Sequence, residues 1–384
     1  MHKIKVCYVC SSFPPLSCGV GDHVAAVQKE LNDLTGLEVH VVTSAGIGVA
    51  SSTRVHPMVN KWNLKGWLDI HRFIQQHNFD CIHFEYPSRY LNDARSWYIK
   101  YFPLTLIFSI LNFFSAKKIH RIITIHECYR ANSLVRLKVF FDALLSKKIL
   151  TVTPIDLKIL ENFSRLKDKL RFMPVGSNII VDSKDVNNPV TFLKNRESTI
   201  RIGFFGFLTP ESGFKDIIAS AKILKTKGRP FIFEIMGGVW NKNYIDEIKQ
   251  EIHLQGMSDN FKWHGFLDDQ SLCKLLGKCS SVVLPFPNGA NTNRSSLIVC
   301  LKVGIPIITT HIPDITPDIF VHEKNMLLIS PGDFYGISES ILRLEEDIIL
   351  RWSIDKGMVD LSNTFSWKEA AKISKELYVS LVAK

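Results

Sequence analysis

The chain has 384 residues, 46% of them hydrophobic, and a net charge of +10 at pH 7. This length supports two cored domains of ordinary size, and the hydrophobic content excludes a disordered protein. Residues 51–150 carry almost the whole excess of charge, yet no helix-turn-helix, zinc-finger or RNA-binding pattern accompanies them. Nucleic acid is therefore not an expected partner.

The first residues and the cysteines indicate in which cellular compartment the protein is expected. Met1 to Lys5 lead straight into an apolar strand, with no separate apolar stretch and no cleavage site, which predicts a cytoplasmic protein. The eight cysteines lie mostly in apolar runs, as expected for buried thiols in a reducing compartment. Cys7 and Cys10 are spaced as C-x-x-C, but positions i and i+3 of a strand face opposite ways, so we expect core residues there.

An aromatic stretch, Trp97–Phe114, precedes three basic residues between positions 117 and 121. It is too short to span a bilayer and contains Pro103. Two interpretations stay open: a helix that dips into an anionic membrane surface, or a helix buried against a sheet. On the first interpretation, residues 97–121 contact the inner face of a membrane peripherally.

Short apolar runs in the first half alternate with a helical pattern. We expect strands at Ile4–Cys10, Glu38–Thr43, Cys81–Phe84, Arg121–Ile125, Leu150–Thr153 and Leu170–Pro174. A helix is expected from Asp22 to about Leu34, and the loop before it, Gly19, Val20 and Gly21, lets the backbone approach a ligand. Such alternation is typical of a doubly wound parallel sheet.

His126 and Glu127 directly follow the expected strand Arg121–Ile125. The carboxyl end of a parallel strand faces the crevice where ligands bind. A lone histidine at such a place is either a ligand-binding residue or simply a satisfied hydrogen-bonding residue. Both interpretations stay open for His126.

Residues 182–199 are polar and carry Pro189 and paired asparagines, which is typical of a linker. A second alternation of strands and helices begins at Ile200 and predicts a second doubly wound domain. Its expected strands are Ile202–Phe205, Phe231–Met236, Lys262–His264, Ser281–Phe286, Pro306–Thr310 and Met326–Ile329. The tail, Ser366–Leu381, has apolar residues at helical spacing and is expected to pack back on the body.

The segment 281–310 has the pattern of a ligand site: a buried strand, a polar loop, a helix and a second buried strand. Arg294 stands where the helix begins, and Ser295 and Ser296 are candidate N-caps. A helix N-terminus beside an arginine suits an anion such as a diphosphate. An ordinary capped loop with a surface arginine would show the same pattern.

The order of these motifs resembles the GT-B glycosyltransferases, specifically retaining family 4, over nearly the whole chain. The motifs that carry the resemblance lie at residues 18–22, 124–127, 173–178, 203–208, 303–308 and 365–367. The resemblance implies two tandem Rossmann-like, doubly wound α/β domains. Their expected bounds are 1–181 for the acceptor side, 182–199 for the linker, 200–365 for nucleotide-sugar binding and 366–384 for a closing helix.

The sequence departs from the family pattern in the second half. The paired glutamates common in the family are absent, and Asn291 stands at the first of their positions, so the chain resembles a subset that lacks them. Phe207 and Ser212 stand where many members carry an Arg and a Lys that clamp the diphosphate. Arg294 and Lys215 are then the cations expected to offset the charge of the leaving group in place of a metal.

The resemblance implies a set of site residues in each domain. The nucleotide and diphosphate are expected at Gly206, Phe207, Lys215, Gly237, Gly238, Phe266, Asn291, Arg294, Ser295 and Ser296. The acceptor-side loop is expected to comprise Gly19, Val20, Gly21, Asp22 and Glu127. His126, Arg294 and Lys215 are the expected catalytic residues, with His126 contacting the sugar, and neither a metal nor a cofactor is expected.

The activity that the resemblance implies is transfer of a hexose from a UDP- or GDP-sugar to a hydroxyl of a glycan or lipid-linked acceptor, with retention, in cell-surface polysaccharide synthesis. Three rival interpretations stay open: a sugar-nucleotide epimerase on the same fold, a catalytically degenerate binding module, and an inverting transferase. Release of product without an acceptor would indicate the first, failure to bind any nucleotide sugar the second, and the anomeric configuration of the product the third.

Overall fold

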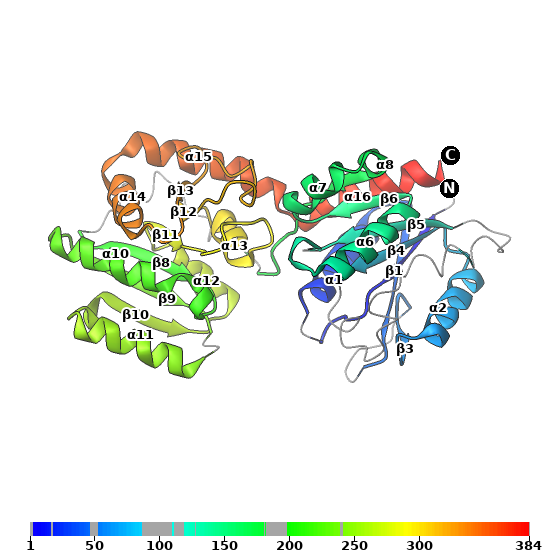
Figure 1. Cartoon of the computed structure of the whole chain (residues 1–384), viewed down its shortest axis with the longest axis horizontal. Helices are drawn as coiled ribbons and strands as arrows, with labels where there is room; N and C mark the ends of the chain where they lie inside the picture. The colour runs from blue at the N-terminus through cyan, green and yellow to red at the C-terminus, as the bar shows by residue number, and fades with distance from the viewer. Residues whose placement is uncertain are drawn as a thin grey trace. The chain divides into compact units, whose positions relative to one another are not determined.

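The computed structural model describes residues 3–16, 18–46, 53–86, 110, 119–126, 128–179, 181, 198–238 and 241–383. The chain forms two compact units (Figure 1). Unit 1 consists of Met1–Asn178 and Ser366–Lys384, and unit 2 of Ile179–Phe365. Most of the expected linker, the aromatic stretch apart from Ile110, and Glu127 lie outside the described residues.

Unit 1 is built on a seven-stranded parallel sheet. Its strands are β1 (Ile4–Val9), β2 (Leu37–Ser44), β3 (Val55–Val59), β4 (Cys81–Tyr86), β5 (His120–Ile125), β6 (Lys148–Thr151) and β7 (Leu170–Phe172). The strand order is β3-β2-β1-β4-β5-β6-β7. Strands β1, β4 and β5 are mostly buried because helices cover both faces, as the apolar runs in the sequence require.

The helices that the structure describes in unit 1 begin at polar caps in most cases. They are α1 (Gly19–Asp33), α2 (Leu64–Gln76), α6 (Ser133–Leu145), α7 (Pro154–Glu161), α8 (Ser164–Lys167) and α16 (Trp367–Val382), with a short 3-10 turn at Cys128–Arg130. The side chains of Asn63, Asn132, Thr153 and Ser366 accept backbone N–H bonds at the starts of α2, α6, α7 and α16. Helix α16 packs against α1, so the expected return of the tail is confirmed.

Unit 2 is built on a six-stranded parallel sheet of order β10-β9-β8-β11-β12-β13. Its strands are β8 (Ile200–Phe205), β9 (Phe231–Met236), β10 (Phe261–Gly265), β11 (Ser281–Leu284), β12 (Ile307–Thr310) and β13 (Leu327–Ile329). Its helices are α10 (Phe214–Thr226), α11 (Lys242–Leu254), α12 (Asp269–Leu276), α13 (Ser295–Val303), α14 (Phe334–Glu346) and α15 (Ile348–Thr364). Short 3-10 turns lie at Pro210–Ser212 and Ser258–Asn260.

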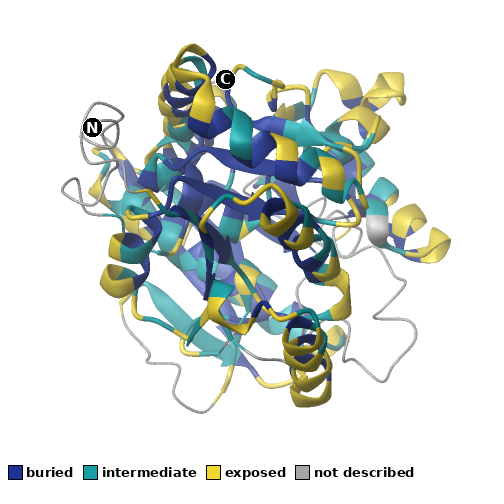
Figure 2. Ribbon diagram, turned by 90° about the vertical axis from the view of Figure 1, so that its left-hand side faces the viewer, coloured by how far each residue is buried: buried dark blue, intermediate teal, exposed yellow. Residues whose placement is uncertain are grey.

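The two sheets form the buried interior of their units. Figure 2 shows most strands in the buried colour and some in the intermediate colour, while the outward faces of the helices are exposed. All eight cysteines are free thiols, and all except Cys18 are buried. The expected two doubly wound α/β domains and the returning C-terminal helix are confirmed.

Two predicted helix starts differ from the structure. Helix α1 begins at Gly19, three residues before the expected cap Asp22, and Cys18 takes the N-cap position without a capping side-chain bond. Helix α13 begins at Ser295, with Arg294 at the N-cap, so neither Ser295 nor Ser296 is the cap. In both helices the residue chosen from the sequence was a good capping type, but the first turn forms without a capping side chain.

Each sheet has one place where the strand order reverses, between β1 and β4 in unit 1 and between β8 and β11 in unit 2. Loops on either side of such a point leave the carboxyl edge in opposite directions, which opens a crevice suited to a ligand. Among the helices that the structure describes, none has the length and apolar character needed to cross a membrane.

Candidate functional site

The expected nucleotide-binding residues of unit 2 gather at the carboxyl edge of its sheet. Gly206 and Phe207 follow β8, Gly237 and Gly238 follow β9, and Phe266 follows β10. Asn291, Arg294 and Ser295 lie in or directly after the loop that follows β11. The loops after β8 and β11 therefore flank the reversal point of this sheet.

Arg294 lies at the start of α13 and is half-buried. Its guanidinium carbon is 4.7 Å from the centre of the Phe286 ring, and its backbone N–H donates to the Asn291 carbonyl at 3.2 Å. The stacking holds a permanent cation beside the ring. The guanidinium at the N-cap has no acceptor for the first N–H groups of α13, so these donors are not capped by it and suit an anion.

Glycines allow the loops at this edge to approach one another closely. Gly237 has a positive φ of 128°, and a Cβ there would lie 2.1 Å from the Gly206 carbonyl oxygen. Gly213, with φ of 71°, would place a Cβ 1.9 Å from the Pro285 carbonyl oxygen. The loops after β8, β9 and β11 are thus packed backbone to backbone, which only glycine permits.

Two phenyl rings at this edge face solvent. Phe207 is 57% exposed and Phe266 is 84% exposed. Phe207 also covers Gly238, where an added Cβ would lie 3.0 Å from the ring. Exposed aromatic rings beside a polar loop are suited to stacking on a planar group.

Lys215 is placed away from the position expected for it. It lies in the first turn of α10, is exposed, and its Nζ donates to Glu247 Oε1 on α11 at 2.7 Å. The ion pair with Glu247 raises the pKa of Lys215. The structure therefore brings Gly206, Phe207, Gly237 and Gly238 together, and it directs the Lys215 ammonium to α11.

In unit 1, His126 lies at the end of β5 and meets an acid on the neighbouring strand. His126 Nε2 lies 2.7 Å from Glu85 Oε2, and the Glu85 carboxyl group is fully buried at the end of β4. The ring of His23, on α1, meets the His126 ring edge-on with centroids 5.0 Å apart. The carboxyl edge beside the reversal point of the sheet thus carries a cluster of His23, Glu85 and His126.

Burial changes the charge states in this cluster. Desolvation raises the pKa of Glu85 to about 7, against the opposing effect of His23. Desolvation lowers the pKa of His23 to about 4, with Glu85 opposing the shift. At neutral pH, His23 is therefore a neutral imidazole, and Glu85 is poised to gain or lose a proton.

The expected acceptor-side loop is part of α1. Gly19, Val20, Gly21 and Asp22 form its first turn, directly before His23. Burial raises the pKa of Asp22. Glu127, the fifth residue of the expected loop, lies outside the described residues.

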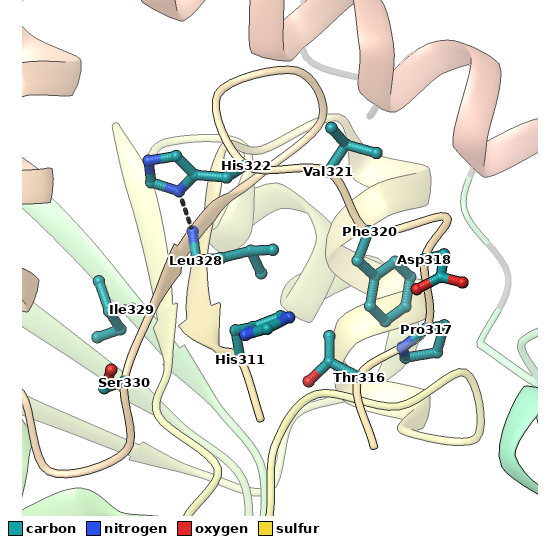
Figure 3. A pocket seen from close by; sticks show the side chains of 10 residues that line it. All are labelled: His311, Thr316, Pro317, Asp318, Phe320, Val321, His322, Leu328, Ile329 and Ser330. Carbon is teal, nitrogen blue, oxygen red and sulfur yellow. Dashed lines mark hydrogen bonds between the residues drawn. The ribbon is translucent and has the colours of Figure 1, made fainter. Parts of the chain in front are cut away.

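A shallow cavity of about 470 Å³ lies elsewhere on unit 2, at the carboxyl ends of β12 and β13 (Figure 3). Thr316, Phe320 and His322 contribute to its lining, and His322 Nδ1 accepts from the Leu328 N–H at 3.0 Å. No expected nucleotide residue lines this cavity, and its lining contains no Lys or Arg. A diphosphate needs such cations, so the loops around Arg294 suit it better.

Sequence reasoning missed Glu85 and gave His23 no role of its own. Both lie against His126 in the folded chain, because β4 lies beside β5 and α1 follows β1. The sequence offered one indication of this, since Glu85 stands at the end of an apolar run and His126 directly follows another. Only the strand order, which the sequence does not state, puts the two ends side by side.

The second unit matches a known family. Residues 191–357 match the model of the family described as Glycosyl transferases group 1. This match lies entirely within unit 2. Among curated relatives, the Staphylococcus aureus capsular polysaccharide biosynthesis glycosyltransferase CapM is 25% identical over 181 residues, 44% of either chain. The Niallia circulans 2-deoxystreptamine N-acetyl-D-glucosaminyltransferase is 25% identical over 208 residues, 52% of this chain and 50% of the relative.

The chain thus spans about half the length of the curated relatives it matches. Solved structures resemble the chain over nearly its whole length. Sucrose-phosphate synthase from Thermosynechococcus elongatus has a TM-score of 0.70 at 14% identity, covering 99% of this chain and 100% of that chain. Anabaena HepE in complex with UDP and glucose has a TM-score of 0.65 at 14% identity, covering 98% and 100%. At such identities the likeness shows the GT-B fold alone.

Proposed function

We propose that this chain transfers a hexose from a UDP- or GDP-sugar to a hydroxyl of a glycan or lipid-linked acceptor, with retention at the anomeric carbon, in the synthesis of a cell-surface polysaccharide. The observation that carries the proposal is Arg294, held on Phe286 at the start of α13. The names of two similar proteins support it: CapM acts in capsular polysaccharide biosynthesis, and HepE was solved with UDP and glucose.

The proposed reaction releases a nucleoside diphosphate, whose charge must be offset. Arg294 supplies a planar cation that bonds phosphate oxygens in pairs, and the amides of Ser295 and Ser296 supply the partial positive charge of a helix start. Such preorganised donors stabilise the leaving group without a divalent cation. Lys215 would join them only by leaving Glu247, an exposed ion pair of small stabilising effect.

The remaining residues of the carboxyl edge position the nucleotide. Gly206 leaves room for a ligand to approach the main chain, Gly237 and Gly238 let the neighbouring loops pack closely around it, and Asn291 is buried in the loop beside Arg294. Phe207 and Phe266 offer faces on which a nucleobase stacks. These roles require the nucleotide to bind in the same crevice as Arg294. Evidence against binding at Arg294 would therefore also contradict them.

In unit 1 we assign His126 to the sugar. A ring oriented by a buried carboxyl group is well suited to bond a hydroxyl in one fixed direction. Glu85 is then a positioning residue, because it contacts His126 and acts through it. The first turn of α1, Gly19 to Asp22, is assigned to the acceptor side.

Thermal stabilisation by a panel of nucleotide sugars tests the proposal. A ligand present at a hundred times its dissociation constant adds about 2.7 kcal/mol to the free energy of unfolding, which is a readily measured shift. We expect stabilisation by at least one UDP- or GDP-sugar, followed by transfer to an acceptor with the anomeric configuration retained. No response to any nucleotide sugar would contradict the proposal and favour a binding module.

The reaction product separates the transferase from an epimerase and from an inverting enzyme. A free epimerised sugar formed without any acceptor would indicate an epimerase. A product of inverted configuration would indicate an inverting transferase, with a general base in place of the sugar contact assigned to His126. In both outcomes the chain still binds the nucleotide sugar. They therefore differ from a result in which no nucleotide sugar binds, which would contradict the Arg294 site.

A further inference from the structure

Three metal-ligating side chains converge in unit 1. His23 comes from α1, Glu85 from the end of β4 and His126 from the residue after β5. One ligand atom of each lies within 4.8 Å of the other two. These residues are far apart in the sequence, so only the folded chain brings their side chains together.

His23 is the unusual member of the cluster. It is only 2% exposed, yet neither of its ring nitrogens has a hydrogen-bond partner among the described residues. Its other ring neighbour is Trp367, which meets it edge-on at 5.3 Å between centroids. A buried imidazole left without a partner costs free energy, so a ligand that the chain itself does not supply would relieve that cost.

The hydrogen bond between His126 and Glu85 does not account for His23. That bond, 2.7 Å long, satisfies His126 Nε2 and one carboxylate oxygen. The second buried histidine of this region, His83, is satisfied separately, by Tyr378 at 2.6 Å and Thr124 at 2.7 Å. Of these three histidines, His23 alone faces the cluster with two ring nitrogens that no described residue bonds.

We propose that His23, Glu85 and His126 bind a first-row transition-metal ion of the Zn²⁺ class. Two imidazoles and one carboxylate are a donor set that suits Zn²⁺, whereas Ca²⁺ and Mg²⁺ select oxygen ligands. Three protein ligands leave a fourth position for water. This site was not expected from the sequence, which offered His126 alone.

The geometry needs only side-chain adjustment. Ligand atoms around a tetrahedral Zn²⁺ lie about 2.0 to 2.2 Å from the ion, and hence about 3.4 Å from one another. The present separations, up to 4.8 Å, close by rotations of the two rings, while the His126–Glu85 contact opens slightly.

Direct metal binding tests the proposal without any measurement of glycosyl transfer. The full chain, without a histidine tag and freed of metal by a chelator, is titrated with Zn²⁺ in a calorimeter and with Co²⁺ in a spectrophotometer. We expect one equivalent to bind tightly and Co²⁺ to give the intense visible absorption of four-coordinate geometry. His23→Ala should weaken binding by at least about 100-fold, more than loss of an outer hydrogen-bond partner does.

A second histidine pair provides the matched control. His40 Nδ1 lies 2.9 Å from His56 Nε2, outside the cluster. The double variant His40→Ala/His56→Ala should bind Zn²⁺ as the wild type does. His23→Gln is a second variant that removes the imidazole ligand. Melting curves of all variants, recorded without metal, show whether each variant is folded, so loss of a metal ligand is separated from misfolding.

Two results would overturn the proposal: a wild-type chain without a one-equivalent site, or folded His23 variants that bind as tightly as the wild type. The proposal goes beyond the proposed function and does not depend on it. A chain that binds nucleotide sugars but no metal would refute the metal site alone. A chain that binds Zn²⁺ but no nucleotide sugar would refute the proposed transfer alone.

Discussion

Gly213 shows how a single residue fixes the loops around Arg294. It adopts φ of 71° directly before α10, and a Cβ there would collide with the Pro285 carbonyl oxygen at 1.9 Å. Replacing it by alanine should push the loop after β8 away from the loop after β11. Because both loops flank the proposed nucleotide crevice, we expect Gly213→Ala to lose both stability and nucleotide-sugar affinity.

Gly228 is a matched control for this substitution. It has a similar φ of 65°, but an added Cβ there meets no atom within 4 Å. Gly228→Ala should therefore lower the free energy of unfolding only by the cost of placing alanine in a left-handed conformation, about 1 to 2 kcal/mol. Urea unfolding should show a clearly larger loss for Gly213→Ala, and equal losses would contradict the packing described here.

Lys138 provides a pH-dependent test of burial. It lies on α6, is 3% exposed, and its ammonium is 4.6 Å from the centre of the Tyr86 ring. Desolvation lowers its pKa to about 8, although Asp142 opposes the shift. An exposed lysine titrates near 10.4, so between about pH 8 and 10 the unfolded chain binds more protons than the folded chain.

The free energy of unfolding should consequently rise with pH across this window, by at most about 3 kcal/mol. In Lys138→Met this rise should be absent. The measurement is urea unfolding of both chains between about pH 7.5 and 10, compared as a difference so that other titrating groups cancel. A difference that does not change with pH would show that Lys138 is not desolvated.

At the scale of single residues, the structure places His126 and Arg294 at carboxyl edges, as predicted: His126 directly follows an apolar run, and Arg294 follows the polar loop after another. It could not predict their partners. The stacking of Arg294 on Phe286 and the bond from His126 to Glu85 depend on which strand lies beside which. Lys215 illustrates the same limit, because its pairing with Glu247 requires α11 to lie beside α10.

At the scale of elements, the returning helix α16 is tied to the sheet of unit 1 by a buried hydrogen-bond chain. The Tyr378 hydroxyl donates to the Tyr8 hydroxyl at 2.7 Å and lies 2.6 Å from His83 Nδ1. All three side chains are almost completely buried. Removing the central hydroxyl would leave the buried His83 Nδ1 without its partner and would take one of its partners from the Tyr8 hydroxyl.

We therefore expect Tyr378→Phe to destabilise the chain by about 1 to 3 kcal/mol. Tyr335→Phe is the control, since Tyr335 on α14 is 66% exposed. Thermal or urea unfolding of the two variants measures the difference. Equal stabilities would mean that the chain of hydroxyls does not hold α16 in place.

Strands were more predictable than helices at this scale. Buried parallel strands appear in the sequence as short apolar runs, and β1, β5, β8 and β9 lie within one or two residues of their expected bounds. Helix α15 gave no comparable signal, because Ile348, Ile349 and Trp352 are exposed while Arg351 is buried. Apolar residues on the outer face of a helix hide the periodicity on which the prediction depends.

At the scale of the whole molecule, the proposed lipid-linked acceptor predicts contact with an anionic membrane. Helix α6 exposes Leu134, Leu137 and Phe141 on one face, and the exposed cations Arg136, on another side of the helix, and Lys147, just beyond its end, lie nearby. This combination of apolar side chains and cations suits an anionic lipid surface. The aromatic stretch expected to contact a membrane lies almost entirely outside the described residues, so α6 is the testable surface.

Vesicle sedimentation tests this expectation. The chain should bind vesicles that contain phosphatidylglycerol, less so at high salt, and not vesicles of phosphatidylcholine alone. Leu137→Glu should weaken the binding, whereas Ile349→Glu, at an 82% exposed position on α15, should not. Binding that is insensitive to lipid charge would contradict the prediction.

The central claim concerns the whole molecule as an enzyme: a nucleoside diphosphate is held by Arg294 and the start of α13. The most direct measurement is the affinity of the nucleotide sugar, together with turnover, for the wild type and for Arg294→Ala. Arg229→Ala, which removes a surface arginine paired with Glu346 in the same unit, is the control. We predict that Arg294→Ala loses about 2 to 3 kcal/mol of binding and of transition-state stabilisation while Arg229→Ala loses neither. Wild-type affinity and turnover in a folded Arg294→Ala chain would contradict the account.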